Sequence, residues 1–173
     1  MTIKGEYLGM PIAIDDVDEI QRQYFAGCSE GDYRLQSCNE CSLLRYPPTT
    51  ACPFCSFPDS TWTSVEPRGV VHSYGEVHHA ILPMFREHVP YQILLVDLDT
   101  QCGKPDEHDA LRVIGNLVNL DGSLAPPELV KRVGIGSRVR MVFCKAGDGL
   151  AIPNWTLDDA AEQPQPPWRY PQE

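Results

Sequence analysis

Hydrophobic and polar positions alternate along much of the second half of this chain, with the two-residue period of β-strands. The strands that this pattern predicts span residues 70–80, 91–98, 111–118, 137–144 and 151–155. Between the third and the fourth, Pro126 and Pro127 can begin a short helix that Gly134 ends. Five strands with a helix in this position are typical of an OB-fold barrel, which we predict over residues 67–157 with a bend in its first strand at Gly75.

The first 30 residues show a different pattern. Residues 1–13 contain glycines and a proline without a sustained period, which predicts a flexible or extended lead-in. Asp15 and Asp16 can cap the helix that follows, and Gly27 can end it. The apolar face of this helix would be formed by Val17, Ile20, Tyr24 and Phe25. A helix of about three turns is marginal alone, so this face must pack on the chain's own domain or on a partner subunit.

Two Cys-x-x-Cys pairs follow the helix. The four residues are Cys38, Cys41, Cys52 and Cys55. Two pairs joined by a hairpin-length insert place four thiolates where they can meet at one point, as tetrahedral zinc requires. The short strands predicted beside them span residues 33–36, 43–46 and 62–65. We therefore predict a mainly β chain in which a rubredoxin-like zinc ribbon over residues 31–66, holding one structural zinc ion, precedes the barrel.

Two other interpretations of the four cysteines stay open. They could form two disulfides, but the first ten residues carry no secretion signal, which predicts a cytoplasmic protein with reduced thiols. They could hold a single iron ion as in rubredoxin, because the spacing allows either metal. Four cysteine ligands close the coordination sphere of either metal, so we expect a structural role and no Lewis-acid chemistry.

The formal net charge of −10 comes from 14 basic and 24 acidic side chains. The predicted barrel itself is nearly balanced, since residues 67–157 carry nine basic and ten acidic side chains. Affinity for nucleic acid depends on Lys and Arg contacts with phosphate, so we expect no nucleic-acid partner. No apolar run reaches membrane-spanning length, so we expect no membrane partner. The Pro- and Gln-rich tail at residues 158–173 is predicted to be loosely ordered or to lie along a partner.

The sequence contains no nucleophile elbow, no phosphate-binding glycine loop and no dinucleotide fingerprint. The cysteines outside the ribbon are poor thiolate candidates, because Cys28 would follow a helix C-terminus and Cys102 lies among acidic residues. Cys144 ends an alternating strand and is expected to serve packing. Strand alternation places His78 and His79 on opposite faces, which favours surface histidines over a second metal site. We therefore expect no catalytic residue in this chain.

Several short motifs accompany these elements. They are the run from Gly27 to Cys38, Arg45-Tyr46-Pro47-Pro48, Pro53, the run from Gly69 to Tyr74, Pro90-Tyr91, Asp97-Leu98-Asp99, Gly115-Asn116-Leu117 and Ile135-Gly136. Together with the order helix, ribbon, barrel, these motifs resemble those of a family of acyl-CoA-associated zinc-ribbon/OB-fold proteins, once catalogued as domain of unknown function 35. The resemblance covers residues from about 16 to 157. The insert at residues 100–109 is longer and more acidic than a plain hairpin and departs from that pattern.

The resemblance implies a subunit that does not itself catalyse. Members of the family look like companions of thiolases, thiolase-like acyltransferases and steroid side-chain aldolases. Their OB module docks on the catalytic subunit and helps form the site for the coenzyme A arm of the substrate. The expected partner is therefore a thiolase-fold or aldolase catalytic subunit, with acyl-CoA at the shared site.

A few residues are candidates for contact with coenzyme A or with the partner. They are Arg45, Arg68 and Arg86 for phosphate groups, and Phe54 and Phe85 for apolar substrate or a partner surface. The loop over residues 81–85 is largely apolar and costly to leave in water. We expect it at a subunit interface or in an acyl-CoA channel.

Two functions from other classes compete with this hypothesis. A single-stranded nucleic-acid-binding OB-fold protein would need a basic groove with stacking aromatic residues, and the charge balance of residues 67–157 does not supply one. A small rubredoxin-like electron carrier would need iron in the cysteine site.

Overall fold

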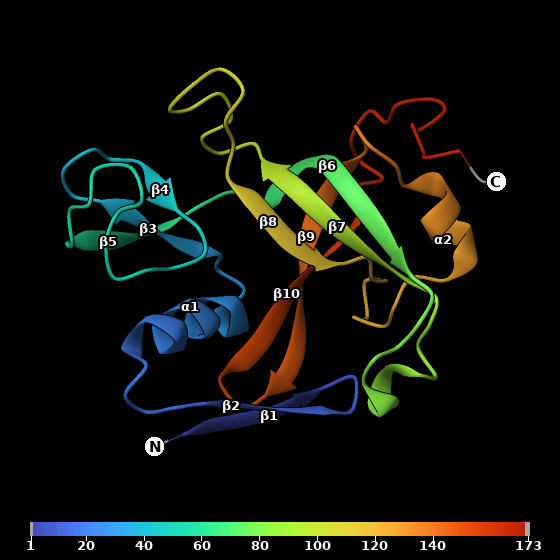
Figure 1. Cartoon of the computed structure of the whole chain (residues 1–173), viewed down its shortest axis with the longest axis horizontal. Helices are drawn as coiled ribbons and strands as arrows, with labels where there is room; N and C mark the ends of the chain where they lie inside the picture. The colour runs from blue at the N-terminus through green and yellow to red at the C-terminus, as the bar shows by residue number, and fades with distance from the viewer. Residues whose placement is uncertain (1, 172–173) are drawn as a thin grey trace.

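The computed structural model describes residues 2–171, which form an N-terminal hairpin and helix, a small ribbon and a barrel (Figure 1). The hairpin consists of β1 (Ile3–Tyr7) and β2 (Met10–Ile14), and α1 (Glu19–Glu30) follows it. The ribbon is a three-stranded antiparallel sheet in the order β4-β3-β5. Its strands are β3 (Arg34–Cys38), β4 (Leu44–Arg45) and β5 (Ser60–Ser64), close to the segments that the sequence predicts.

A five-stranded sheet in the order β10-β9-β6-β7-β8 forms the barrel. Its elements are β6 (Arg68–Val77), the 3-10 turn η1 (Pro83–Phe85), β7 (Tyr91–Leu98), β8 (Arg112–Asn116), α2 (Pro127–Arg132), β9 (Arg138–Gly147) and β10 (Leu150–Leu157). The end of β8 closes on β10, because Leu117 forms a parallel bridge with Trp155 and the Val118 amide donates to the Trp155 carbonyl oxygen at 2.8 Å. This closure, with α2 between β8 and β9, is OB-fold topology and confirms the predicted fold class.

The register of β6 is irregular at His72, and the bend predicted at Gly75 stays a prediction. The register of β6 against β7 shifts between Val71 and Ser73, which leaves His72 without a Cα partner in the ladder. A Cβ added at Gly75 would meet nothing within 4 Å, so no close approach of backbone requires glycine there. The His72 imidazole instead lies 3.0 Å from an Asp97 carboxylate oxygen on the outer face.

Helix α1 begins and ends later than predicted. Asp18 is the N-cap, and its carboxylate accepts from the Gln21 amide at 3.0 Å. Val17 therefore precedes the helix and is 85% exposed. Gly27 stays inside the helix, where a Cβ would come within 2.8 Å of the Asp32 carbonyl oxygen, and Gly31 ends it at φ 75°.

The N-terminal segment is a hairpin and not a flexible or extended lead-in. Leu8 and Gly9 both have positive φ, as a two-residue hairpin turn of type I′ requires, and leucine in that position gives no recognisable turn signal. The hairpin is held on the barrel by Tyr7, whose hydroxyl accepts from the Asn116 and Asn154 side-chain amides at 3.1 and 3.0 Å.

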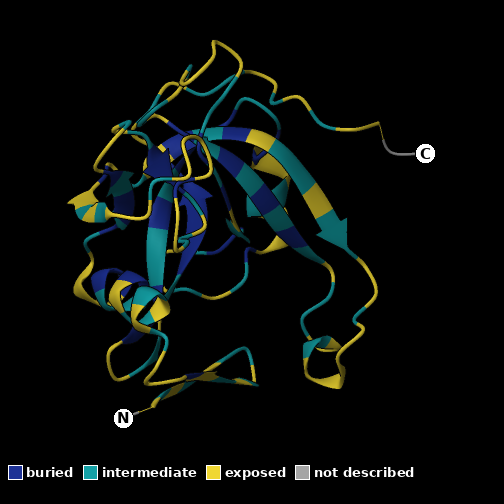
Figure 2. Cartoon of the chain, turned by 60° about the vertical axis from the view of Figure 1, so that its left-hand side comes forward, coloured by how far each residue is buried: buried dark blue, intermediate teal, exposed yellow. Residues whose placement is uncertain are grey.

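One continuous hydrophobic cluster joins helix, ribbon and barrel. It includes Tyr24 and Cys28 of α1, Tyr33 and Leu35 of the ribbon, and Trp155 of the barrel. Buried residues gather where these parts meet, whereas the loop around η1 is largely exposed (Figure 2). Of the two predicted alternatives for the helix, packing on its own chain is the observed one.

The described part of the C-terminal tail lies along the chain's own barrel. The Ile135 amide donates to the Trp168 carbonyl oxygen at 2.8 Å, and the Tyr170 amide donates to the Tyr74 hydroxyl at 2.8 Å. The sequence predicted a tail that is loosely ordered or bound to a partner, whereas the contacts observed are with the chain's own barrel. These contacts join residues far apart in the sequence, so no local pattern indicates them.

Candidate functional site

The four ribbon cysteines converge as predicted. Their sulfur atoms all lie within 4.8 Å of one another, with Cys38 and Cys55 at 3.5 Å and Cys41 and Cys52 at 3.6 Å. Four thiolates about 2.3 Å from a tetrahedral zinc ion would stand about 3.8 Å apart, whereas a disulfide would need about 2.0 Å. The arrangement is compatible with a metal site, and all four residues are free cysteines.

The two cysteine turns are built alike. The Ser42 amide donates to the Cys38 carbonyl oxygen and the Ser56 amide to the Cys52 carbonyl oxygen, both at 2.9 Å. Both serines adopt the left-handed conformation, at φ 61° and 65°. This geometry turns backbone amides toward the sulfurs, and the hydrogen bond from the Cys41 amide, ahead of that from Glu40, lowers the pKa of Cys38 to about 6. Amide donors of this kind stabilise the thiolate that either zinc or iron requires.

Arg45 lies inside the ribbon. Its side chain is 1% exposed and donates to the backbone carbonyl oxygens of Thr49, Pro58 and Asp59 at 3.1, 3.2 and 3.3 Å. These contacts fix the segment that carries the second cysteine pair to β4. The expected phosphate contact of Arg45 stays a prediction, and its surroundings favour a role within the ribbon.

Phe54 sits at the tip of the second cysteine turn and is 46% exposed. It borders a cleft of about 210 Å³ between the ribbon and the start of β8, which Arg45 and Leu111 also line. Of the five predicted contact residues, Arg45 and Phe54 are therefore brought together.

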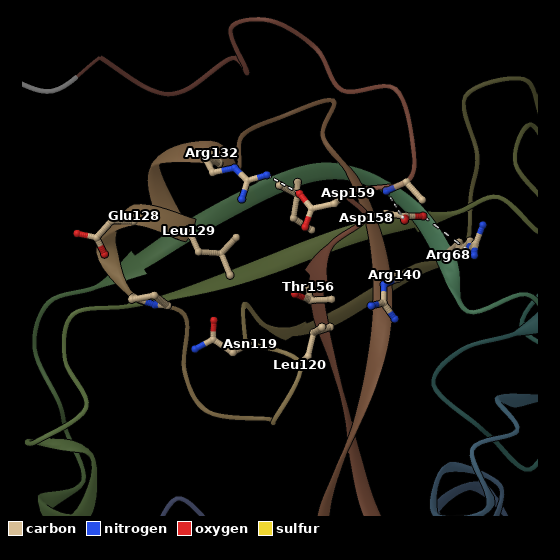
Figure 3. A pocket seen from close by; sticks show the side chains of 13 residues that line it. Arg68, Asn119, Leu120, Glu128, Leu129, Arg132, Arg140, Thr156, Asp158 and Asp159 are labelled. Carbon is tan, nitrogen blue, oxygen red and sulfur yellow. Dashed lines mark hydrogen bonds and ion pairs between the residues drawn. The ribbon is translucent and has the colours of Figure 1, made fainter.

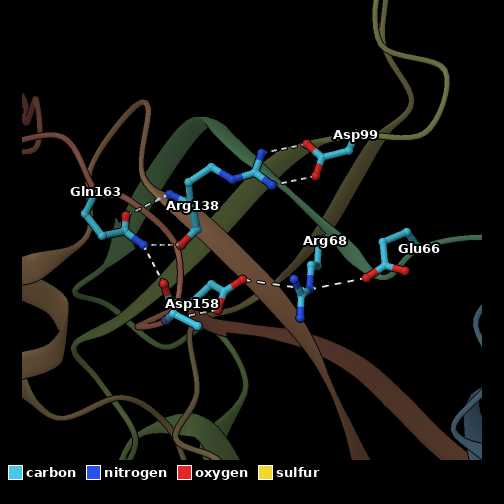
Figure 4. Close-up of polar contacts among 7 residues, drawn as sticks. Glu66, Arg68, Asp99, Arg138, Asp158 and Gln163 are labelled. Carbon is cyan, nitrogen blue, oxygen red and sulfur yellow. Dashed lines mark hydrogen bonds and ion pairs between the residues drawn. The ribbon is translucent and has the colours of Figure 1, made fainter.

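Arg68 opens β6 and borders a larger cleft of about 660 Å³, lined also by residues of α2 and β10. Figure 3 shows Arg68, Arg132 and Arg140 around this cleft, with Asn119 on the opposite side. The Arg68 guanidinium lies 3.3 Å from a Glu66 carboxylate oxygen and 3.8 Å from one of Asp158 (Figure 4). The cleft is therefore lined by carboxylates as well as arginines, so it is not an anion-binding site formed by cations alone.

Phe85 and Arg86 lie in the loop that joins β6 to β7. The ring of Phe85 packs with those of His88 and Tyr91, at centroid distances of 6.4 and 6.2 Å, and Arg86 is exposed. The neighbouring Ile81 is 90% exposed and Leu82 44%. The predicted apolar loop is therefore open to solvent in the isolated chain.

Cys28, His78 and His79 differ in position from the prediction: β6 ends at Val77, so the two histidines follow the strand and do not alternate within it. Cys28 is inside α1 and fully buried, because the helix extends beyond it. Burial raises the pKa of the Cys28 thiol to about 12 and raises that of Cys144. His78 and His79 are both exposed.

Two hydrogen bonds between the barrel and the ribbon could not be predicted from the sequence. The side chain of Gln101, in the acidic insert after β7, accepts from the Leu44 amide at 2.6 Å and donates to the Leu44 carbonyl oxygen at 3.1 Å. The insert thereby pairs with the free edge of β4 and ties the ribbon to the barrel.

Most arginines of the described chain are paired with acidic side chains. The ion pairs join Arg34 to Glu30 and Asp32, Arg68 to Glu66 and Asp158, Arg112 to Asp97, Arg132 to Asp159, Arg138 to Asp99, and Arg169 to Glu76. A binder of single strands needs a groove of cations free for phosphate, and this pairing argues against that alternative.

Comparisons with known proteins agree with this architecture. The family described as "ChsH2, C-terminal OB-fold domain" matches residues 62–144. A chain of the solved structure named Ltp2-ChsH2(DUF35) aldolase superposes with a TM-score of 0.62 at 25% identity, over 83% of this chain and 98% of that one. A DUF35-family protein of unknown function from Sulfolobus solfataricus has the same fold, with a TM-score of 0.50 at 14% identity over 83% and 95% of the two chains.

A curated relative is the "Probable enoyl-CoA hydratase alpha subunit" of Thermomonospora curvata. It is 30% identical over 132 residues, which are 75% of this chain and 35% of that protein. The chain thus spans about a third of the length of the curated relative that it matches.

Fold and site together define an OB-fold protein with a four-cysteine ribbon. Over residues 62–144 the chain matches the ChsH2 C-terminal OB-fold family, and its likeness to the chain of the Ltp2-ChsH2(DUF35) aldolase confirms the DUF35 resemblance that its sequence motifs predicted. Within residues 2–171, no helix combines the length and the apolar character needed to cross a membrane.

Proposed function

We propose that this chain is the non-catalytic zinc-ribbon/OB-fold subunit of a complex that acts on an acyl-CoA thioester. It would dock on a catalytic subunit of thiolase or aldolase type and help enclose the coenzyme A end of the substrate. The observation that carries the proposal is the likeness to the Ltp2-ChsH2(DUF35) aldolase chain, because it extends over 83% of this chain and nearly all of the other. The curated relative is also named as a subunit of an enzyme of acyl-CoA chemistry.

The loop around η1 supports a docking role. Ile81, Leu82 and Met84 are 90%, 44% and 38% exposed, and the tip of the N-terminal hairpin approaches Met84. Apolar side chains gathered on a projecting loop are typical of surfaces that a partner covers. We assign this loop, with Phe85 at its base, to the interface with the catalytic subunit.

The cleft beside Arg68 supports the proposed contact with coenzyme A. Arg140 lines the same cleft, and among residues 2–171 it has no acidic partner within ion-pair distance. Arg68 is about half exposed and would exchange a Glu66 or Asp158 contact for a phosphate oxygen. Arg86 is exposed on the η1 loop, where it could reach a phosphate group at the interface.

The metal that we propose for the ribbon is zinc, in a structural role. The thiolates of Cys38, Cys41, Cys52 and Cys55 would hold it, and it would supply no open coordination position. A colourless protein with about one zinc per chain is expected, and a coloured protein containing iron would contradict the assignment.

Purification of the tagged chain from its native lysate tests the proposal. Mass spectrometry of co-eluting chains should identify a thiolase-fold or aldolase subunit, which would also give the substrate class. Recovery of the chain with bound nucleic acid and without a protein partner would contradict it.

The loop assignment has its own test. The variant Ile81→Asp should weaken binding of the catalytic subunit roughly tenfold or more, because a charge would enter an apolar interface. Val17→Asp is a matched control, since Val17 is equally exposed at 85% and lies outside the loop. Equal binding by both variants would remove the loop from the interface.

A further inference from the structure

The cleft beside Arg68 contains a row of three polar side chains from neighbouring strands. In the barrel sheet, Arg140 of β9 stands opposite Arg68 of β6 on one side and opposite Thr156 of β10 on the other. Residues paired in this way point to the same face of a sheet, and all three line the cleft of about 660 Å³ (Figure 3). We call Arg68, Arg140 and Thr156 the cleft row.

Two like charges stand side by side in the cleft row. Directly opposed residues of an antiparallel pair have Cβ atoms about 4.5 to 5.5 Å apart, and like charges in that position destabilise a sheet. Among residues 2–171, no carboxylate lies within ion-pair distance of Arg140. The contacts of Arg68 with Glu66 and Asp158 therefore offset the repulsion only in part.

The donors of the cleft row are free. Within the described chain, neither the Arg140 guanidinium nor the Thr156 hydroxyl has a hydrogen-bond partner. Arg68 approaches Glu66 and Asp158 through its Nε, at 3.3 and 3.8 Å, and its terminal nitrogens donate no hydrogen bond within residues 2–171 (Figure 4). The cleft row can therefore offer hydrogen bonds and positive charge to one anion.

Thr156 is the most enclosed member of the cleft row. The residue is 4% exposed, and buried hydroxyl groups in native proteins normally have a hydrogen-bond partner. Its hydroxyl oxygen is not fully enclosed by protein, so a molecule in the cleft can reach it. An acceptor that contacts Arg140 would lie beside this hydroxyl, because the two residues are paired in the ladder.

The cleft row matches a phosphate monoester better than a diester. A monoester carries about two negative charges near neutral pH and presents three terminal oxygens as acceptors. Three neighbouring donors, two of them cationic, fit those oxygens and compensate both charges. Each phosphate of a diester carries one charge and presents two such oxygens. In coenzyme A the 3′-phosphate of the adenosine is the single monoester, and the other two phosphates form a diphosphate diester.

The wall beside the cleft row is apolar. Pro126 and Leu129 line it at α2, and Leu120 stands at its rim with 67% exposure. Apolar side chains of this kind can cover the face of a nucleobase, and the cleft volume lies in the range typical of sites for small organic molecules. The cleft thus combines a phosphate-binding end with an apolar wall, as a phosphorylated nucleoside requires.

We propose that the cleft row binds the 3′-phosphate of coenzyme A, with the adenosine against Leu120, Pro126 and Leu129. This inference rests on the proposed function and adds a specificity to it. An acyl group on a carrier protein is held through a phosphodiester and lacks the 3′-phosphate. The complex would therefore select free acyl-CoA over acyl groups bound to a carrier protein.

Titration of the isolated chain with coenzyme A and with dephospho-coenzyme A tests the proposal, because the two compounds differ only in the 3′-phosphate. We expect coenzyme A to bind at least about tenfold more tightly and to shift the NMR signals of the Arg140 and Thr156 backbone amides. Equal binding of the two compounds would overturn the inference and leave the proposed function standing. Absence of binding by either compound would also overturn it, since this chain alone supplies the cleft row.

Three variants locate the recognition. Arg140→Gln should bind the two compounds equally, and Thr156→Val should lower the preference for coenzyme A about threefold to fivefold. Lys145→Gln is the matched control, because Lys145 lies on the same strand, is 80% exposed and does not line the cleft. It removes the same charge and should keep the preference. A preference retained by Arg140→Gln, or lost equally in Lys145→Gln, would contradict the assignment.

Thermal unfolding gives a second readout. Because Arg140 faces Arg68 without a carboxylate of its own, Arg140→Gln should melt at the same temperature as the unaltered protein or higher. Coenzyme A should raise the melting temperature of the unaltered protein more than that of Arg140→Gln. If Arg140→Gln melts markedly lower without coenzyme A, the arginine serves the fold and the proposal fails.

Discussion

Cys28 and Cys144 are both buried, and loss of water around their sulfurs raises the pKa of each thiol. Cys102 is exposed in the insert after β7. The other four cysteines would be protected as metal ligands, because a thiolate bound to zinc reacts slowly with thiol reagents. The reactivity of each thiol therefore depends on the environment that the fold provides.

We expect one thiol per metal-loaded chain to react rapidly with a disulfide reagent, and Cys102→Ser to abolish this reaction. A strong chelator should add the four ribbon cysteines to the reactive set. Rapid reaction of Cys28 in the folded protein would contradict its placement inside the core.

Asp99 and Arg138 form a two-point ion pair, with nitrogen–oxygen distances of 2.6 and 2.5 Å (Figure 4). Hydrogen bonding from Arg138 holds the pKa of Asp99 below its ordinary value of 3.8. A lowered pKa in the folded state stabilises the protein above that ordinary value, and the contribution is lost as the pH falls through the folded pKa.

The variant Asp99→Asn should therefore be less stable than the unaltered protein at neutral pH. The Asp99 side chain is 40% exposed, so solvent screening limits the difference in unfolding free energy to roughly 0.5 to 1 kcal/mol. Urea titrations should show that the difference shrinks below about pH 4. A difference independent of pH would show that the ion pair is not its origin.

At the scale of elements, the contact between Gln101 and Leu44 determines how the ribbon sits on the barrel. It satisfies both backbone groups of Leu44 from an insert that belongs to the barrel. Gln101→Ala should lower the free energy of local opening at β4 by about 1 to 2 kcal/mol, because two hydrogen bonds are lost.

Amide hydrogen exchange measures this effect at Leu44. Exchange should accelerate roughly tenfold in the variant, while the amides of β7 and β9 keep their rates. Thr61→Ala is a suitable control, since the Thr61 hydroxyl contacts Asn39 on another part of the ribbon. Unchanged exchange at Leu44 in Gln101→Ala would mean that the insert does not hold the ribbon.

The elements that could be predicted are those with local signals. Alternation marks the barrel strands, Pro126 and Pro127 mark α2, and the cysteine spacing marks the ribbon. The hairpin, in contrast, depends on Tyr7 reaching Asn116 and Asn154, more than 100 residues away. The helix ends were misplaced because several residues can serve as cap, and tertiary packing selects Asp18 and Gly31.

At the scale of the whole molecule, the candidate functional site also combines features that have a local sequence signal with features that have none. The convergence of the four ribbon cysteines follows from one local motif, so it could be predicted from the sequence. A cavity lined by residues of β7, α2 and the tail combines segments far apart in the sequence, and no local pattern predicts it. The burial of Arg45 in the ribbon and its bonds to backbone carbonyl oxygens likewise have no local sequence signal, because they depend on how the ribbon folds around the side chain.

We propose that this chain completes a binding site for acyl-CoA and that a partner subunit carries out the catalysis. The most direct measurement compares acyl-CoA turnover by the isolated chain, by the purified partner and by the reconstituted complex. We predict no turnover by the isolated chain, and a complex that binds acyl-CoA at least about tenfold more tightly than the partner alone. Turnover by the isolated chain, or equal affinity of the partner with and without it, would contradict the account.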